Sequence, residues 1–282
     1  MREYNYSVVI PFRGKCDLLI KAINSIPDRE DIEIIIVDNN DTPYGQNQMP
    51  LPSNARLVYL TSDPTMGAGR ARNEGLKHVN GQWILFLDAD DYFTPKAFDA
   101  FDKYLTSDFD IIYYDADSIR LKDGVQSDRH TSIHRYVQGY LNTGNEDLLR
   151  YRFVNPIAKM MKASFVLKSE IKFEEVKASN DMMFSIRTGH AAKTIAADPT
   201  TVYMITEGEK NTSLTRTHSK ENQWTRYQVY IRQYHFMESI GRKDLRFHLL
   251  SSTIHAFTEL GFSTGLKFLR FALKERVNIF LR

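Results

Sequence analysis

The first 118 residues alternate short apolar runs with helix-compatible stretches, and this alternation constrains the fold more than any other feature of the chain. Most runs are apolar at consecutive positions, as expected of strands that are covered on both faces. We therefore predict an α/β fold with a mostly parallel sheet flanked by helices. The predicted strands are 7–11, 32–37, 56–61, 83–87 and 111–114, and the predicted helices are 17–26, 69–79 and 94–105.

Residue types at the element boundaries and in the later part of the chain refine this prediction. Thr94 and Pro95 are typical of a helix N-cap followed by proline at the first helical position. Irregular composition predicts a long loop over 39–54 and an excursion from the sheet over 118–136. The remaining predictions are helices near 146–151 and 180–188, a strand near 194–205, and an all-helical pattern over the last 64 residues.

The composition excludes several classes of protein. With 42% hydrophobic and 26% charged residues, the 282-residue chain is neither disordered nor fibrous. The longest apolar runs, 34–37 and 83–87, fall far below the roughly 18 residues of a membrane-spanning helix. The N-terminus lacks the features of a signal peptide. Cys16 is the only cysteine, so we expect no internal disulfide, no cysteine-based zinc site and a cytoplasmic location.

The net charge of +2 conceals two halves of opposite sign. Residues 1–118 contain 11 basic and 19 acidic residues, a net charge of −8, whereas residues 119–282 have a net charge of +10. An acidic half suggests metal ligands or acid/base carboxylates, and a basic half suggests phosphates or an anionic surface. Ordinary solvated faces are the alternative for both.

The C-terminal stretch 265–282 has the pattern of a basic amphipathic helix. Its apolar residues at three- and four-residue steps are Leu266, Leu269, Leu273, Val277 and Phe280, and its basic residues are Lys267, Arg270, Lys274 and Arg276. One interpretation is a helix packed on its own core with a solvated basic face. The other is a helix lying on an anionic membrane. A third interpretation is a homo-oligomer in which the apolar stripe is buried against a second subunit.

Three carboxylates, Asp88, Asp90 and Asp91, follow the apolar run 83–87. In an extended chain Asp88 and Asp90 point to the same side, about 6.6 Å apart at Cα. A divalent cation, Mg²⁺ or Mn²⁺, that bridges them to a diphosphate would relieve their repulsion. The alternative is that Asp91 caps a turn and the other two are solvated.

Two further strand ends should meet the carboxylates at the same edge of the sheet, where ligands bind in open α/β folds. Asp38 follows the second run, although aspartate is also a common turn residue. Phe12 and Arg13 follow the first run.

A glycine-rich segment, 66–75, lies between a predicted strand and a predicted helix. Arg72 stands where a dinucleotide-binding fingerprint requires its third glycine, so the spacing excludes that site. Arg70 and Arg72 at a helix start favour a bound phosphate or a neighbouring carboxylate, with surface arginines as the alternative.

Four motifs in this order resemble the family 2 glycosyltransferases of bacterial surface-polysaccharide synthesis. They are Val-Ile-Pro at 9–11, Val-Asp-Asn-Asn at 37–40, the glycine-rich segment at 67–75, and Phe-Leu-Asp-Ala-Asp-Asp at 86–91. The resemblance implies a GT-A (Rossmann-like) fold, a nucleotide-diphosphate sugar donor, a divalent metal at the D-x-D motif and inversion at the anomeric carbon. It covers roughly residues 6–206. It implies a GT-A domain over 1–206, with a nucleotide-binding half (1–118) and an acceptor-binding half (119–206), and leaves 207–282 as a loop and helical C-terminal extension.

The resemblance also assigns roles to individual residues. It places Asp88 and Asp90 at the ribose and metal, with Asp91 lining the donor site. Asn39 and Asp41 depart from the commoner pattern, so uridine is the expected base and thymidine the alternative. The residues implied in donor binding are Pro11, Phe12, Arg13, Asp38, Asn40, Gly67, Arg70, Arg72, Asp88, Ala89 and Asp90.

The family has an acidic pair at the start of a late helix, where this chain has Asn180 and Asp181. The resemblance makes Asp181 the general base, and the alternative is a carboxylate that stabilises the helix dipole. Lys159 matches a lysine near the acceptor or phosphate, or else is a surface lysine. The resemblance implies His218 as a third metal ligand, with a solvated histidine as the alternative. It implies that Arg216 neutralises charge on the diphosphate.

We therefore expect an inverting, Mn²⁺- or Mg²⁺-dependent transfer of a hexose or N-acetylhexosamine from a UDP-sugar to an oligosaccharide or lipid-linked acceptor, at the inner face of the membrane and with no nucleic-acid partner. A sugar-1-phosphate nucleotidyltransferase is disfavoured because 11–15 contains no G-x-G-T-R loop. A phosphatase with an aspartate nucleophile is disfavoured because its D-x-D motif would follow the first strand, whereas Asp88 follows at least three predicted strands. A non-catalytic sugar-binding protein is the alternative that Asn180 favours.

Overall fold

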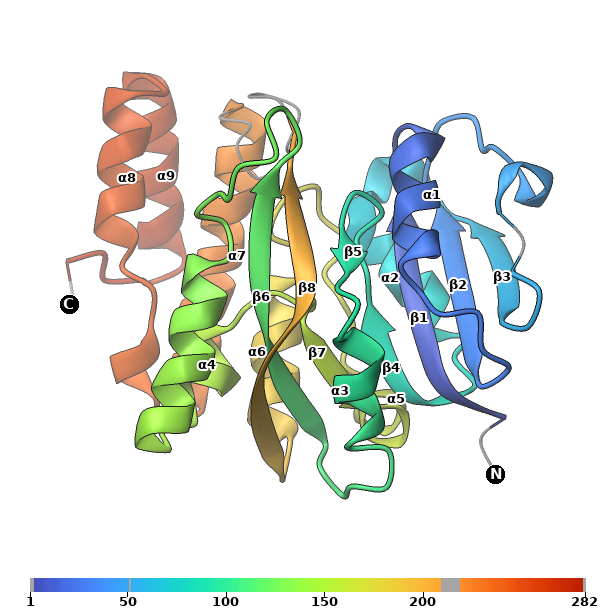
Figure 1. The fold of residues 1–282 in the computed structure, drawn as a ribbon. Helices are drawn as coiled ribbons and strands as arrows, with labels where there is room; N and C mark the ends of the chain where they lie inside the picture. The colour runs from blue at the N-terminus through green and yellow to red at the C-terminus, as the bar shows by residue number, and fades with distance from the viewer. Residues whose placement is uncertain (1–2, 51, 209–218, 281–282) are drawn as a thin grey trace.

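Four parallel strands form one half of an eight-stranded sheet in the computed structural model, which describes residues 3–50, 52–208 and 219–280 (Figure 1). They are β1 (Tyr4–Phe12), β2 (Ile32–Asp38), β3 (Arg56–Thr61) and β4 (Gly81–Phe86), in the order β3-β2-β1-β4. Every residue of β2 is buried, as the consecutive apolar pattern predicts. The register pairs Phe12 with Asp38, so β1 and β2 end side by side.

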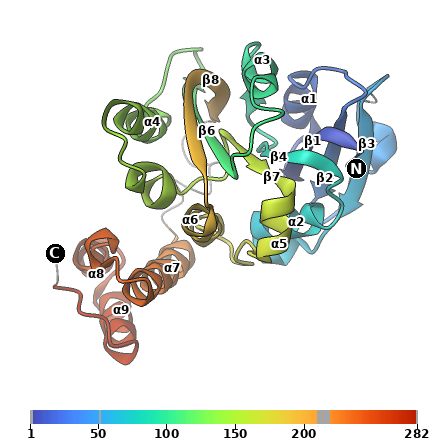
Figure 2. The ribbon, with the colours of Figure 1, turned by 90° about the horizontal axis from the view of Figure 1, so that it is seen from below.

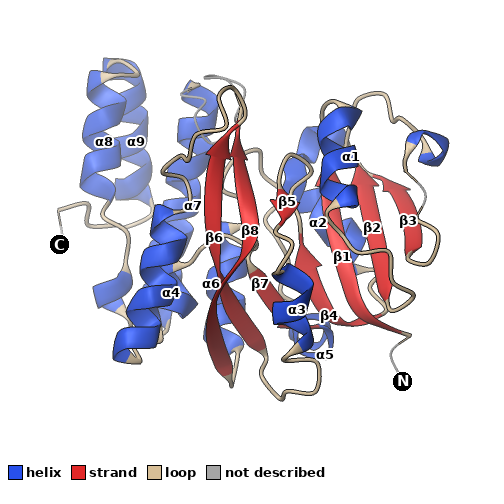
Figure 3. Ribbon diagram, in the orientation of Figure 1, coloured by secondary structure: helices blue, strands red, loops and turns tan. Residues whose placement is uncertain are grey.

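The other half of the sheet mixes directions. β7 (Lys159–Lys162) is antiparallel to both β4 and β6 (Ile111–Arg120), and β8 (Ile195–Glu207) is parallel to β6. β5 (Tyr92–Phe93) pairs antiparallel with β8 at the edge. The prediction of an α/β fold with a mostly parallel sheet is confirmed, and Figure 3 shows its strands in red.

Helices cover both faces of this sheet, as Figure 2 shows from below. α1 (Cys16–Asn24) and α3 (Ala97–Asp102) lie on one face, whereas α4 (Thr131–Thr143) lies across β6 and β8 from α3. α2 (Gly67–Leu76), α5 (Ala163–Ser169) and α6 (Met182–Ala191) lie on the other, and a π-helical turn, η3 (Leu148–Arg152), contacts both α4 and α6. Short 3-10 turns occur at Gln46–Gln48, Pro64–Met66 and Lys243–Leu245.

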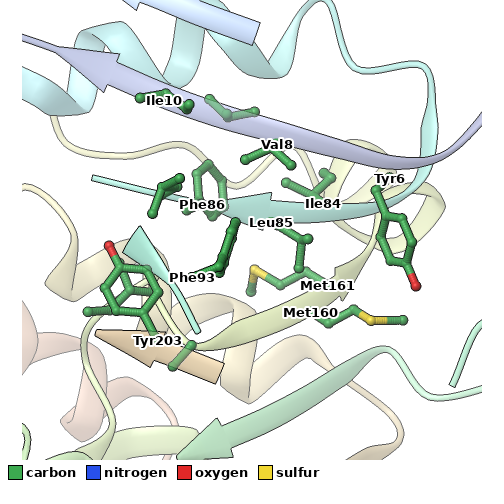
Figure 4. Packing of buried hydrophobic residues seen from close by; sticks show 14 of the residues in the cluster. Tyr6, Val8, Ile10, Ile84, Leu85, Phe86, Phe93, Met160, Met161 and Tyr203 are labelled. Atoms are coloured by element: carbon green, nitrogen blue, oxygen red, sulfur yellow. The ribbon is translucent and has the colours of Figure 1, made fainter. Parts of the chain in front are cut away.

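The described residues after 218 form α7 (Lys220–Ser239), α8 (Leu249–Thr258) and α9 (Phe262–Lys274), and contain no strand, in agreement with the sequence. Buried side chains from Tyr6 to Ile205 form one hydrophobic cluster, to which Val8, Leu85 and Met161 belong (Figure 4). A second cluster lies among α7, α8 and α9, and a third joins α6 to α7. Among the described residues, no helix combines the length and apolar content needed to cross a bilayer.

Several local predictions were wrong. α3 begins at Ala97 and not at Thr94, because the Thr94 hydroxyl donates to the Thr201 carbonyl of β8 (2.7 Å) and does not cap the helix. The excursion predicted over 118–136 is shorter than expected: β6 continues to Arg120, the chain leaves the sheet over 121–130, and α4 begins at Thr131. The sequence analysis missed β5, β7, α4 and α5. The two strands are only two and four residues long, so they show no periodicity.

The predicted apolar stripe of the C-terminal helix is also partly wrong. α9 buries Gly265, Phe268 and Ala272, whereas Leu273 remains 67% exposed. Phe280 lies beyond the helix and is 73% exposed. The helix therefore packs through the face that carries Phe268 and Ala272, and Leu273 stays in solvent.

Candidate active site

Asp38 ends β2 and organises the loop that follows. Its buried carboxylate accepts hydrogen bonds from the backbone N–H groups of Asn40 and Tyr44, each at 2.9 Å. The Tyr59 hydroxyl also donates to it, and burial together with this carboxylate raises the pKa of Tyr59 to about 12. Asp38 thus holds the backbone that borders the expected nucleoside position.

The end of β1 lies against the same loop. Pro11 and Phe12 are buried, and the Phe12 ring packs on Tyr44 with centroids 5.5 Å apart. The exposed Arg13 guanidinium donates to the Pro64 carbonyl at 2.6 Å.

Polar contacts continue from β1 into the loop after β2. Arg13 also contacts the Asp41 carboxylate at 3.3 Å, and the Asn40 side-chain oxygen accepts from the Gly14 N–H at 2.9 Å. The structure therefore brings the residues predicted at the first two strand ends together.

The D-x-D segment follows β4 and is anchored from β8. The Tyr203 hydroxyl accepts from the Asp88 N–H (3.0 Å) and donates to the Asp91 carboxylate (2.9 Å), which also accepts from the Thr206 N–H (2.7 Å). Asp91 is buried and its carboxylate is bonded within the protein, so its place in the donor site stays a prediction. Burial, followed by the charges of Asp90 and Asp88, raises the pKa of Asp91 well above its usual value.

Asp90 keeps an exposed surface within this crowded region. The protein atoms around it desolvate its carboxyl, and the negative charge of Asp88 adds to that effect, so the pKa of Asp90 is raised; the positive charges of Arg129 and Arg72 oppose the shift. A carboxyl in this environment favours a partner that brings positive charge.

Arg72 connects the D-x-D segment to the segment before α6. Its guanidinium donates to the Asp88 carboxylate at 2.6 Å and to the Asn180 side-chain oxygen at 2.9 Å, and its side chain is only 6% exposed. The alternative of a surface arginine is therefore wrong for Arg72, and the neighbouring-carboxylate interpretation is confirmed. Arg70 pairs with Glu175 at 3.0 Å from a more exposed position.

The glycines of the 66–75 segment allow a close approach of the chain before α6. A Cβ atom on Gly69 would lie 2.1 Å from the Glu174 carbonyl oxygen, and one on Gly67 would lie 2.8 Å from that of Val176. Gly67 also has φ +72°, which favours glycine. In this structure the glycines therefore make room for the chain before α6 and not for a dinucleotide.

Asp181 immediately precedes α6 and makes no capping hydrogen bond to it with its side chain. Burial raises the pKa of Asp181; the charge of Asp88 adds to the shift, whereas the charges of Arg72 and Lys159 oppose it. Ser179, two residues before, has φ +56°, a conformation that a non-glycine residue keeps only where the surrounding structure holds it. A carboxyl with a raised pKa is a suitable proton acceptor.

Lys159 on β7 is 2% exposed, so the alternative of a surface lysine is wrong. Its ammonium group donates to the Phe153 carbonyl at 2.8 Å and lies 4.5 Å from the Phe153 ring centroid and 5.1 Å from that of Tyr113. Burial lowers the pKa of Lys159 to about 7, against the attraction of Asp181.

The D-x-D carboxylates fit a divalent cation as a partial ligand set. Within the described residues, no three His, Cys, Asp or Glu side chains gather closely enough to hold a metal by themselves. Mg²⁺ is commonly bound through one or two carboxylates together with substrate phosphates and water, which matches Asp88 and Asp90. His218 and Arg216 lie outside the residues that the structure describes.

A second polar cluster on β6 and α4 was missed in the sequence. His134 contacts the buried Asp115 carboxylate at 2.6 Å, and His130 lies 3.4 Å from Asp117. His130 directly precedes α4 and His134 lies on it, so their four-residue spacing at a helix start was the available signal. Met204 of β8 pairs with Asp117 on one side and with Tyr92, which follows the D-x-D segment, on the other, so only one strand separates this cluster from that segment.

Comparison with known proteins agrees with the fold and the motifs. The model of glycosyl transferase family 2 matches residues 7–166. Over 214 residues the chain is 27% identical to a poly(ribitol-phosphate) beta-glucosyltransferase of Bacillus spizizenii, covering 71% of this chain and 32% of that protein. The chain thus spans about a third of this relative's length.

Solved structures share the fold. Residues 1–349 of Staphylococcus aureus TarS superpose with a TM-score of 0.63 at 17% identity, covering 96% of this chain and 79% of that chain. The same fragment in complex with UDP-GlcNAc gives a TM-score of 0.58 at 18% identity, covering 96% and 72%. Both show the GT-A fold that the motifs imply.

Proposed function

Because the chain belongs to glycosyl transferase family 2, we propose that it transfers a sugar from a UDP-sugar to a glycan or lipid-linked glycan acceptor in the synthesis of a surface polysaccharide. The single observation that carries this proposal is the placement of Arg72 between Asp88 and Asn180. One buried guanidinium thereby brings the D-x-D segment and the segment ending in Asp181 into one site.

Asp181 is the proposed general base. Its carboxylate accepts the proton of the acceptor hydroxyl while that oxygen attacks the anomeric carbon, and the bond to the nucleoside diphosphate breaks on the opposite side. This single displacement inverts the anomeric configuration. The raised pKa of Asp181 makes it a stronger proton acceptor than a solvated aspartate, and such a base contributes roughly 10² to 10⁴ in rate.

Asp88 and Asp90 are the proposed holders of Mn²⁺ or Mg²⁺. When bound, the cation would supply positive charge to the departing diphosphate. The guanidinium of Arg72 holds the Asp88 carboxylate at 2.6 Å, so the side chain is oriented before any donor arrives. Such preorganisation keeps the reorganisation needed during the reaction small.

The strand-end residues are the proposed nucleoside pocket. Pro11 and Asp38 sit at the paired ends of β1 and β2, and Asn40 connects the following loops through its contact with the Gly14 N–H. Uridine is the proposed base, and the similar fold of a fragment solved with UDP-GlcNAc supports that choice.

The helical extension is the proposed contact with an anionic membrane. Phe262 (71% exposed) and Leu273 are eleven residues apart on α9, which places them within about 20° of each other around the helix. Arg270 and Lys274 lie beside this stripe and are exposed. Exposed aromatic and aliphatic side chains next to cations are typical of helices at anionic interfaces.

Thermal unfolding with UDP, TDP or GDP, each with Mn²⁺ or with EDTA, tests the donor class, since a ligand that binds only the folded state raises Tm. We expect stabilisation by UDP with Mn²⁺ and its loss with EDTA. Transfer is then assayed with UDP-glucose and UDP-N-acetylglucosamine, with poly(ribitol phosphate) as one acceptor because a similar protein bears that name. No response to any of the nucleotides would contradict the proposal.

A further inference from the structure

The segment 170–181, which ends in Asp181, is held on one side by α2. The Asn73 side chain donates to the Phe173 carbonyl and accepts from the Phe173 N–H, both at 2.9 Å. Gly69 lies so close to the Glu174 carbonyl that no side chain fits between them. One flank of the segment is therefore fixed by the nucleotide-binding half.

The other flank is held by α7 of the helical extension. Arg232 makes two parallel hydrogen bonds to Glu174: Nε to Oε1 at 2.6 Å and Nη2 to Oε2 at 2.9 Å. The Glu174 side chain is 14% exposed, so this ion pair is shielded from solvent on the glutamate side. A two-point arginine–carboxylate contact fixes orientation as well as distance.

Glu174 is coupled directly to the end of the segment. Its backbone N–H donates to the Asn180 carbonyl at 3.1 Å, which closes a loop on the residue before Asp181. Asn180 is also the residue that Arg72 contacts. A displacement of Glu174 is therefore passed to Asn180 and Asp181 through one hydrogen bond.

α6 and α7 also pack side by side, as Figure 2 shows. Met183 and Ile186 of α6 belong to the same buried cluster as Val229 and Met237 of α7. The helix that Asp181 precedes and the helix that carries Arg232 therefore share a core, and Val176 of the segment packs against it.

We propose that Arg232 is a positioning residue for the reaction: from the helical extension, its two-point contact with Glu174 holds segment 170–181 so that Asp181 reaches the acceptor hydroxyl. This proposal rests on the proposed function of Asp181. It gives the extension a role in the chemistry that is separate from any membrane contact.

The test compares Arg232→Gln with Arg232→Lys, which keeps the charge but loses the planar fork. We expect Arg232→Gln to lower kcat about 10- to 100-fold, because small misplacements of a reacting group have effects of that size. The donor KM and the rise in Tm with UDP should stay unchanged, and Arg232→Lys should recover part of the loss. Hydrogen exchange of segment 170–181 should accelerate in Arg232→Gln.

Lys177→Gln is the matched control. Lys177 lies on the same segment and pairs with Glu221 of the same helix at 2.9 Å, but both side chains are more than half exposed, so the pair contributes little. Its kcat and exchange should match the wild type. Wild-type kcat in Arg232→Gln, or a lower kcat without faster exchange, would overturn the proposal. If the wild type transfers no sugar, the proposed function fails, and exchange alone then decides whether Arg232 holds the segment.

Discussion

The Arg72 guanidinium lies 2.6 Å from the Asp88 carboxylate and is almost completely buried, whereas Asp88 is one-third exposed. The arginine thus holds the Asp88 side chain from its buried side, and part of the aspartate stays exposed to solvent. Its second contact, to Asn180, makes it the link between the two functional segments.

Arg72→Met should therefore weaken both the fold and the reaction. Removing the guanidinium leaves the Asp88 carboxylate and the Asn180 oxygen without their donor, which we expect to lower the free energy of unfolding by about 1–3 kcal/mol. Urea unfolding measures this change, and transfer should fall in the same variant.

Arg70→Met is the control for this substitution. Arg70 lies on the same helix, but its pair with Glu175 is partly solvated and should contribute little to stability. Equal losses in the two variants would contradict the special position of Arg72.

Asp181→Asn should abolish most of the transfer while the protein still binds UDP. The amide cannot accept the acceptor proton as a carboxylate does, so kcat should fall by about 10² to 10⁴. Titration with UDP in the presence of Mn²⁺ checks that the donor site is intact. A variant with wild-type kcat would show that another group is the base, and a wild type without any transfer would favour a non-catalytic sugar-binding protein.

Lys159→Met should change how stability depends on pH. Between pH 7, near the pKa of the buried lysine, and pH 10.5, its ordinary value, the unfolded chain binds a proton that the folded chain does not. The free energy of unfolding of the wild type should therefore rise with pH across this window relative to that of the variant.

Urea midpoints of both proteins, measured between pH 7 and 10, test this expectation. Lys162→Met is the control, because Lys162 lies three residues along the same strand and reaches the exposed Asp108. Parallel pH profiles for the wild type and Lys159→Met would mean that the lysine stays charged in the folded protein.

Replacing both Phe262 and Leu273 with serine should release the protein from vesicles that contain anionic lipid. Cosedimentation of the wild type should weaken as salt is raised and be weak with neutral vesicles, since the adjacent cations contribute electrostatically. Leu167→Ser, an exposed leucine on α5, is the control. Absence of vesicle binding by the wild type would refute the membrane contact, and a concentration-dependent dimer that the serine variant loses would assign the surface to a second copy.

The sequence was most informative where a physical rule acts locally. Consecutive apolar residues predicted β2 and β4, and with them the convergence of Asp38 and Asp88 at one edge of the sheet. The glycine-rich motif placed Arg72, and the family resemblance placed Asp181, among the candidate residues, although their roles in the reaction stay predictions.

What the sequence did not predict depends on distant partners. Lys159 was ambiguous because its burial results from Phe153 and Tyr113 closing over it, and no local pattern encodes that packing. The missed strand β5 is two residues long and exists only because β8 lies beside it. The contact of Thr94 with β8 likewise overrode a helix-start pattern that was locally sound.

The Tyr203 hydroxyl, which bonds to both the Asp88 N–H and the Asp91 carboxylate, has a consequence for how this protein can diversify. A chimera that kept residues 1–118 but took its β8 from a relative without this hydroxyl would keep the D-x-D sequence. It would lose the hydrogen bonds that position Asp88 and Asp91. The two parts of the fold are therefore not interchangeable modules, and altered donor preference can arise from substitutions more than a hundred residues away from the motif that receives the donor.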